Sequence, residues 1–204
     1  MLLCFEVLSE LLPVLIFAIF YGRHLKKEGI AVAGSHICLL ALFIIYLMGV
    51  FHFTGAGTLF EGTRFGLELR YDQINLIPFS KNINWVGHGL NIVLFIPLGV
   101  LLPLLWKKYQ RLLPVAATGL AFSVLIELSQ LLNIRVSDVD DLILNTLGAL
   151  LGYLLGKPLS LLAKKMGIPA SDGGAMAWGI LLLVFFGRFF LYDEMLFASY
   201  LYGF

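Results

Sequence analysis

The stretch 86-VGHGLNIVLFIPLGVLLPLL-105 decides the fold of this chain, because its twenty residues contain no Asp, Glu, Lys or Arg. An α-helix rises about 1.5 Å per residue, so a helix of this length covers about 30 Å. That distance matches the hydrocarbon core of a bilayer. The stretch therefore predicts a transmembrane helix.

Five further apolar stretches lie before and after it along the sequence. Together they predict six spans, at residues 5–22, 32–53, 86–105, 112–132, 142–163 and 175–192. Only 13% of the residues are charged, against about 25% in average soluble proteins, which leaves no room for a soluble domain. We therefore expect an all-α polytopic membrane helix bundle that forms one domain over residues 1–204. In the fifth span Pro158 can end or kink the helix, and residues 157–165 can instead form an amphipathic turn in the interface.

The positions of Lys and Arg predict the orientation of the bundle. Three basic clusters fall on one side of the spans: Arg23, Lys26 and Lys27; Lys107, Lys108 and Arg111; and Lys157, Lys164 and Lys165. Cytoplasmic loops carry an excess of such residues, so that side is predicted to be cytoplasmic and both termini extracytoplasmic. We expect a multi-pass protein of a bacterial plasma membrane. A net charge of +1 gives no reason to expect nucleic acid as a partner.

Strongly polar side chains inside the spans gather towards the predicted outer ends. They are Asn91 in the third span, Ser123, Glu127 and Gln130 in the fourth, Asp141 and Asn145 in the fifth, and Arg188 in the sixth. Burying such groups in lipid is costly unless they pair with one another or line a cavity. We therefore predict an outward-facing polar pocket, with Arg135 and Arg188 as candidate partners of Glu127. A purely structural network that fastens the helix ends remains the alternative.

The fifth span also carries glycines at four-residue spacing, at Gly148, Gly152 and Gly156. Such a strip lets another helix approach closely, and plain packing suffices to explain it. Asn145 lies on nearly the same face, so the polar site is expected beside this seam. We expect Ser123 to bond back to its own helix rather than to act as a nucleophile.

Four segments in order carry a resemblance to a known family. They are 75-NLIPF-79, 91-NIVLFIPLG-99, 123-SVLIELSQ-130 and 135-RVSDVDDLILNTLGALLGY-153. Together they resemble the VanZ-like family over about residues 70–156. That family is named for a bacterial protein linked to low-level resistance to teicoplanin, a glycopeptide antibiotic. The resemblance implies an integral membrane protein of the cell envelope, and it points to Asn75, Pro78, Phe79, Asn91, Glu127, Gln130, Arg135, Asp138, Asp141 and Asn145.

Two features of the outer connections leave more than one interpretation open. The long connection that contains Asn75 and Phe79 can re-enter the interface and cover the pocket, or it can serve as an interfacial anchor. Asp138, Asp140 and Asp141 with Glu127 offer oxygen ligands for Mg²⁺ or Ca²⁺. However, Asp140 or Asp141 can simply cap the fifth helix, and we expect no metal or other cofactor.

The sequence predicts binding or modification of an envelope amphiphile at the outer leaflet. The expected ligand is a membrane lipid, a lipid-linked cell-wall precursor or a lipoglycopeptide. Glu127 would be the central polar group, Arg135 and Arg188 would recognise an anion, and Asn91, Gln130 and Asn145 would orient it. Whether the protein is an enzyme stays open: Glu127 can act as an acid or base on head groups. A transporter or flippase ranks last, because no inverted repeat is evident.

Overall fold

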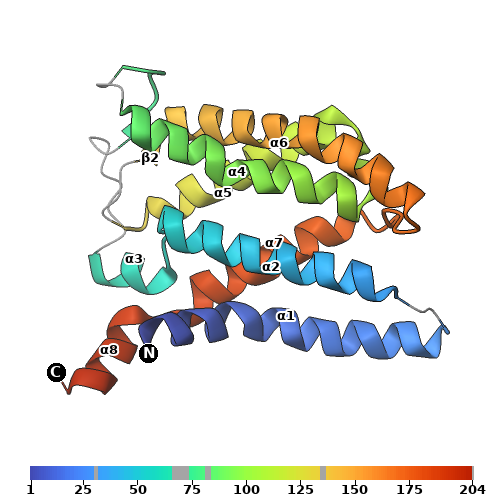
Figure 1. Cartoon of the computed structure of the whole chain (residues 1–204). Coiled ribbons are helices and arrows are strands. Elements are labelled where there is room, and N and C mark those ends of the chain that lie inside the picture. Colours follow the sequence, from blue (N-terminus) through green and yellow to red (C-terminus); the bar gives the residue numbers. More distant parts are fainter. Residues whose placement is uncertain (30–31, 66–73, 81–83, 134–136, 204) are drawn as a thin grey trace.

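A computed structural model of the chain describes residues 1–29, 32–65, 74–80, 84–133 and 137–203. Long helices run side by side along one direction (Figure 1). Their bounds, with those of the shorter elements, are α1 Leu2–Lys27, α2 Gly34–Thr54, α3 Leu59–Phe65, β1 Ile74–Asn75, α4 Trp85–Leu105, η2 Lys107–Gln110, α5 Leu112–Gln130, β2 Ser137–Asp138, α6 Val139–Lys165, α7 Ala175–Phe186, η3 Gly187–Leu191 and α8 Glu194–Tyr202.

The helices confirm the predicted all-α membrane bundle. Within the described residues, α1, α2, α4, α5 and α6 are each long and apolar enough to cross a membrane. The helix formed by α7 and the π-helical η3 passes this test together with α8, from which it is bent by 49°, so the described residues contain five such spans, or six if this pair counts as one. Pro158 does not end the fifth span, because α6 continues through it to Lys165. The segment 157–165 is therefore the end of a long helix, and its separate interfacial turn was the wrong alternative.

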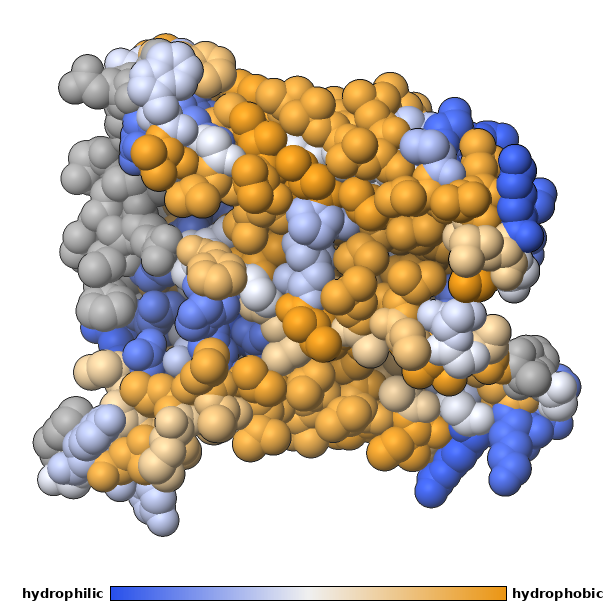
Figure 2. All heavy atoms as spheres, in the orientation of Figure 1, coloured by the Kyte–Doolittle hydropathy of each residue, from blue (hydrophilic) through white to orange (hydrophobic). Residues whose placement is uncertain are grey.

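The two ends of the bundle differ in composition. The end of α1, the α4–α5 connection and the end of α6 lie together at the right of Figure 1, and these segments carry the three basic clusters. Both termini and α3 lie at the opposite end. Figure 2 shows an apolar band between two ends that bear hydrophilic residues. The grouping of the basic clusters is as expected, while the assignment of that end to the cytoplasm stays a prediction.

Helices α4 and α6 pack backbone to backbone along the predicted glycine strip. A Cβ on Gly152 would lie 2.0 Å from the carbonyl oxygen of Ile96, and one on Gly148 would lie 2.2 Å from that of Ile92. Side-chain carbon cannot occupy such positions, so only glycine permits this approach. The seam fixes α4 and α6 relative to each other, and with them the polar residues at their ends.

Aromatic side chains fill the space between α2, α4 and α5. The Phe122 ring lies 5.4 Å from the rings of both Phe51 and Phe95, measured between centroids. All three side chains are fully buried. Such edge-on and tilted contacts add to the stability gained from apolar burial, so this cluster holds α2 against α4 and α5.

Candidate functional site

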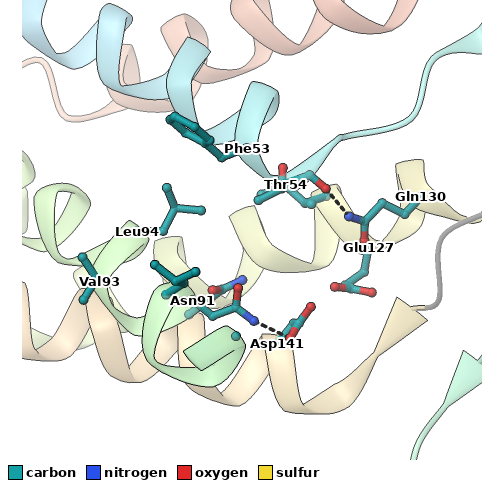
Figure 3. Close-up of a pocket in the computed structure, with 12 residues that line it drawn as sticks. Phe53, Thr54, Asn91, Val93, Leu94, Glu127, Gln130 and Asp141 are labelled. Carbon is teal, nitrogen blue, oxygen red and sulfur yellow. Dashed lines mark hydrogen bonds between the residues drawn. The ribbon is translucent and has the colours of Figure 1, made fainter. Parts of the chain in front are cut away.

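A cavity of about 580 Å³ opens between α2, α4, α5 and α6 (Figure 3). Its size falls in the range of small-molecule sites. Its polar lining includes five of the residues that the sequence singles out: Asn91, Glu127, Gln130, Asp141 and Asn145. Apolar side chains from α2, α4 and α5 complete the lining: Phe53, Leu90, Val93, Leu94 and Ile126. The structure thus brings residues from three predicted spans to one place, and α2 adds residues that sequence reasoning missed.

Hydrogen bonds between helices hold the amide side chains of this cavity. Asn91 on α4 donates its Nδ2 hydrogen to Asp141 Oδ1 on α6 at 2.5 Å. Asn145 donates from Nδ2 to Ser123 Oγ at 2.9 Å, and Ser123 donates in turn to the Asp141 carbonyl oxygen at 3.4 Å. The expectation that Ser123 bonds within its own helix was wrong. Asn145 occupies the hydroxyl oxygen, and α6 offers an acceptor within reach.

Glu127 and Gln130 are fixed by backbone groups of neighbouring segments. The Glu127 carboxyl accepts the backbone N–H of Asp138 at 3.0 Å, just ahead of the first turn of α6. Gln130 donates from Nε2 to the Thr54 carbonyl oxygen at the end of α2, at 2.7 Å. An N–H group near a helix N-terminus is a favourable partner for a carboxylate. Arg135, the other expected partner of Glu127, lies outside the described residues.

Arg188 lies in a different place from the one predicted. It donates to the Glu6 carboxyl on α1 and to the Ala56 carbonyl oxygen, the latter at 3.2 Å, and its Nη1 lies 3.7 Å from Glu10 Oε1. Its guanidinium also stacks over the Tyr192 ring at 4.7 Å. Of the two candidate partners of Glu127, Arg188 is therefore excluded, because α1 supplies two nearer carboxylates. Arg188 lines a second polar cavity, of about 350 Å³, rather than the first.

Sequence reasoning missed Glu6 and Glu10 as partners of Arg188. A usable signal was present, since the two acids are four residues apart inside an apolar stretch and so share one helix face. Acidic residues placed in this way need a partner within the bundle.

The described residues 74–80 of the long connection between α3 and α4 (called the outer connection after its predicted side) are fastened to the start of α6. Strand β1 pairs in parallel with β2, and Asn75 donates from Nδ2 to both carboxyl oxygens of Asp138, at 3.0 and 3.1 Å. Asp140 accepts the Phe79 N–H at 2.8 Å. Asp138 is the N-cap of α6 and accepts the Asp140 N–H, so the alternative in which Asp140 or Asp141 caps this helix was wrong. Asn75 and Phe79 do not line the cavity, and the covering role of this connection stays a prediction.

The carboxylates considered as metal ligands are divided among separate tasks. Asp138 caps α6, Asp140 holds Phe79, and Asp141 accepts from Asn91. Among the residues that the structure describes, no group of three or more His, Cys, Asp or Glu side chains is placed to hold a metal ion. The geometry of the described residues therefore gives no argument for a metal at this site.

The apolar spans and the polar cavity at one end define a multi-pass integral membrane protein. Comparison with known sequences shows that the chain belongs to the VanZ/LLP1 family, whose model matches residues 37–162. Protein VanZ of Enterococcus faecium is 35% identical over 113 residues, which cover 55% of this chain and 68% of that protein. No solved structure matches the chain. The matched range contains every residue that lines the larger cavity, whereas Glu6 and Arg188 lie outside it.

Proposed function

We propose that this protein is a VanZ-type envelope protein that binds a membrane amphiphile, with the head group of the ligand in the larger cavity. The observation that carries this proposal is the mixed lining of the cavity. Carboxyl and amide groups gather on one side of it, while Phe53, Val93 and Leu94 form an apolar side (Figure 3). A ligand with a polar head and an apolar chain matches both sides at once.

The apolar side of the cavity continues onto the outer surface of the bundle. Phe53, Leu90 and Val93 are 73%, 61% and 60% exposed, respectively. In a bilayer, apolar side chains at this position on α2 and α4 contact lipid tails. The apolar tail of the ligand therefore leaves the cavity between α2 and α4 and lies among the lipids, while its head group stays beside Glu127 and Asp141.

Family membership supports a role in the cell envelope and, within this proposal, a contribution to glycopeptide resistance. Membrane lipids, lipid-linked cell-wall precursors and lipoglycopeptides all join a polar head to an apolar chain. Each of these fits the cavity in the same orientation. In this proposal the predicted extracytoplasmic position of the cavity gives it access to all three.

A second candidate function is catalysis on the bound head group. Two carboxyl groups, those of Glu127 and Asp141, line one cavity, and such pairs can serve as acid and base. Envelope mass spectrometry with and without the protein separates the two functions. A covalent species that appears or disappears indicates an enzyme, whereas unchanged chemistry indicates binding. Transport ranks last, because the 49° bend of the sixth span belongs to elements outside both the family match and the lining of the larger cavity.

Photo-crosslinking tests the proposed site directly. A lipid with a diazirine near its head group is expected to label α4, α5 or α6 beside the cavity in membranes that contain the protein. Glu127→Gln and Asn91→Leu should each reduce this labelling, whereas Asp172→Asn, an exposed acid paired with Lys107 at the basic end, should not. Unchanged labelling in both cavity variants, with unchanged teicoplanin sensitivity of the cells, would contradict the proposal.

A further inference from the structure

We infer that the cavity selects amphiphiles whose head group carries an ammonium, rather than those with a phosphate or another anion. This inference rests on the proposed function, because it concerns the ligand of the same cavity. It departs from the expectation that arginine side chains recognise an anion here. The hydrogen-bonding groups and the charges of the lining both lead to it.

Each amide NH₂ group of the cavity already donates one hydrogen bond to the protein. Asn91 donates to Asp141, Gln130 to the Thr54 carbonyl, and Asn145 to Ser123. Their orientations follow from these partners. A carboxylate and a carbonyl can only accept, and the Ser123 hydroxyl accepts from Asn145 because it donates to the Asp141 carbonyl.

Two amide oxygens of the lining have no partner among the described residues, and both are acceptors. Gln130 Oε1 and Asn145 Oδ1 are buried and accept no hydrogen bond from any described residue. Their residues are only 6% and 3% exposed and both line the cavity. A buried acceptor without a donor costs free energy, so the ligand that suits this cavity supplies the donors. An ammonium offers three donors and no acceptor.

The charge of the lining agrees with the hydrogen bonding. Among the described residues that line the cavity, Glu127 and Asp141 are ionisable and none is Lys, Arg or His. Arg188 is held by Glu6 in the second cavity. An ammonium placed between two carboxylates offsets the cost of burying them. A phosphate would instead bring negative oxygens against carboxylate and amide oxygens.

Competition among chain-matched amphiphiles tests this inference on the full-length protein in neutral maltoside micelles. The probes are hexadecylammonium, hexadecyl phosphate and neutral hexadecyl maltoside, measured by displacement of the photo-crosslinking lipid. Hexadecylammonium is expected to displace that lipid at a concentration about tenfold or more below that of hexadecyl phosphate. Butylammonium tests whether the ligand is a membrane amphiphile or a small water-soluble ammonium compound. We expect it not to displace the lipid, because its short alkyl chain does not reach the apolar side of the cavity.

Variants show whether the preference arises in the cavity. Glu127→Gln and Asp141→Asn should each lower the ratio between ammonium and phosphate, and Asp172→Asn should leave it unchanged. Equal or tighter binding of hexadecyl phosphate would overturn the inference while leaving the proposed function in place. An unchanged preference for ammonium in the double variant Glu127→Gln with Asp141→Asn would also overturn the inference and leave the proposed function in place. Displacement by none of the three amphiphiles would overturn both.

Discussion

Arg188 in the last span and Glu6 in the first span form a buried ion pair between residues 182 positions apart in the sequence. The approach of the two helices is close at the same level, because a Cβ on Gly187 would lie 2.4 Å from the Ser9 carbonyl oxygen. The pair therefore closes the bundle by joining its first and last spans, separately from the larger cavity.

Arg188→Ala is expected to destabilise the protein by about 3–5 kcal/mol, because it leaves the buried Glu6 and Glu10 without their cation. Thermal unfolding of the detergent-solubilised protein measures this loss. Lys107→Ala is the control: it removes an exposed lysine paired with the exposed Asp172 at 2.9 Å and should cost about 1 kcal/mol or less. Equal losses in the two variants would show that the buried pair does not stabilise the bundle.

Gly152→Ala is expected to force α4 and α6 apart. The added Cβ would meet the Ile96 carbonyl oxygen at 2.0 Å, and backbone cannot yield as a flexible side chain does. We expect a loss of about 1–3 kcal/mol in unfolding experiments, together with weaker amphiphile binding, since Asn91 and Asp141 lie on the two separated helices. Gly179→Ala in α7, where nothing lies within 4 Å of the new Cβ, should be neutral or slightly stabilising. Similar losses in both variants would mean that helix flexibility, not the seam, explains the effect.

Asp138→Ala is expected to loosen the start of α6 and the outer connection together. It removes both the N-cap acceptor of the Asp140 N–H and the acceptor of Asn75. The expected cost of the cap is about 1 kcal/mol. Hydrogen exchange should become faster in the first turn of α6, whereas Asp138→Asn, which keeps a capping oxygen, should change it less. Unaltered hydrogen exchange in the Asp138→Ala variant would show that the Asp138 side chain does not stabilise the start of α6.

Cysteine labelling checks the predicted orientation of the bundle. In a background with Cys4→Ala and Cys38→Ala, Thr63→Cys and Lys108→Cys place single exposed thiols at opposite ends. A membrane-impermeant maleimide added to intact cells should label Thr63→Cys and leave Lys108→Cys unlabelled until the cells are lysed. The reverse pattern would place the cavity on the cytoplasmic side.

The polar residues of the larger cavity could be predicted from the sequence because each of them is a strongly polar residue in or beside an apolar span, where burial is costly. Glu127 and Gln130 lie three residues apart within an apolar stretch, and the cost of burying them does not depend on which helix is adjacent. That they lie near Asn91 and Asp141 was predicted only because all four residues have a similar depth in the predicted spans. Phe53 and Thr54 escaped notice, because an aromatic side chain and a backbone carbonyl at the end of a span carry no polar signal of their own.

The identity of each partner could not be predicted in the same way. Arg188 has the right depth for either cavity, and its depth does not say whether α1 or α5 lies beside it. Asp138, Asp140 and Asp141 differ little in sequence context, yet one caps α6, one holds Phe79 and one binds Asn91. These assignments depend on the direction in which each side chain leaves the start of α6 and on the path of the outer connection.

The sequence by itself determined the all-α membrane bundle, the end at which the basic clusters gather, the close glycine seam and the family. Each of these follows from residues near one another along the chain, because transfer into hydrocarbon and helix length are local properties. Only the tertiary structure decided that the polar groups divide into two cavities, with Arg188 in one and Glu127 in the other. That division depends on which helices are neighbours, and a hydrogen bond or ion pair forms only between groups that packing brings within about 3 Å.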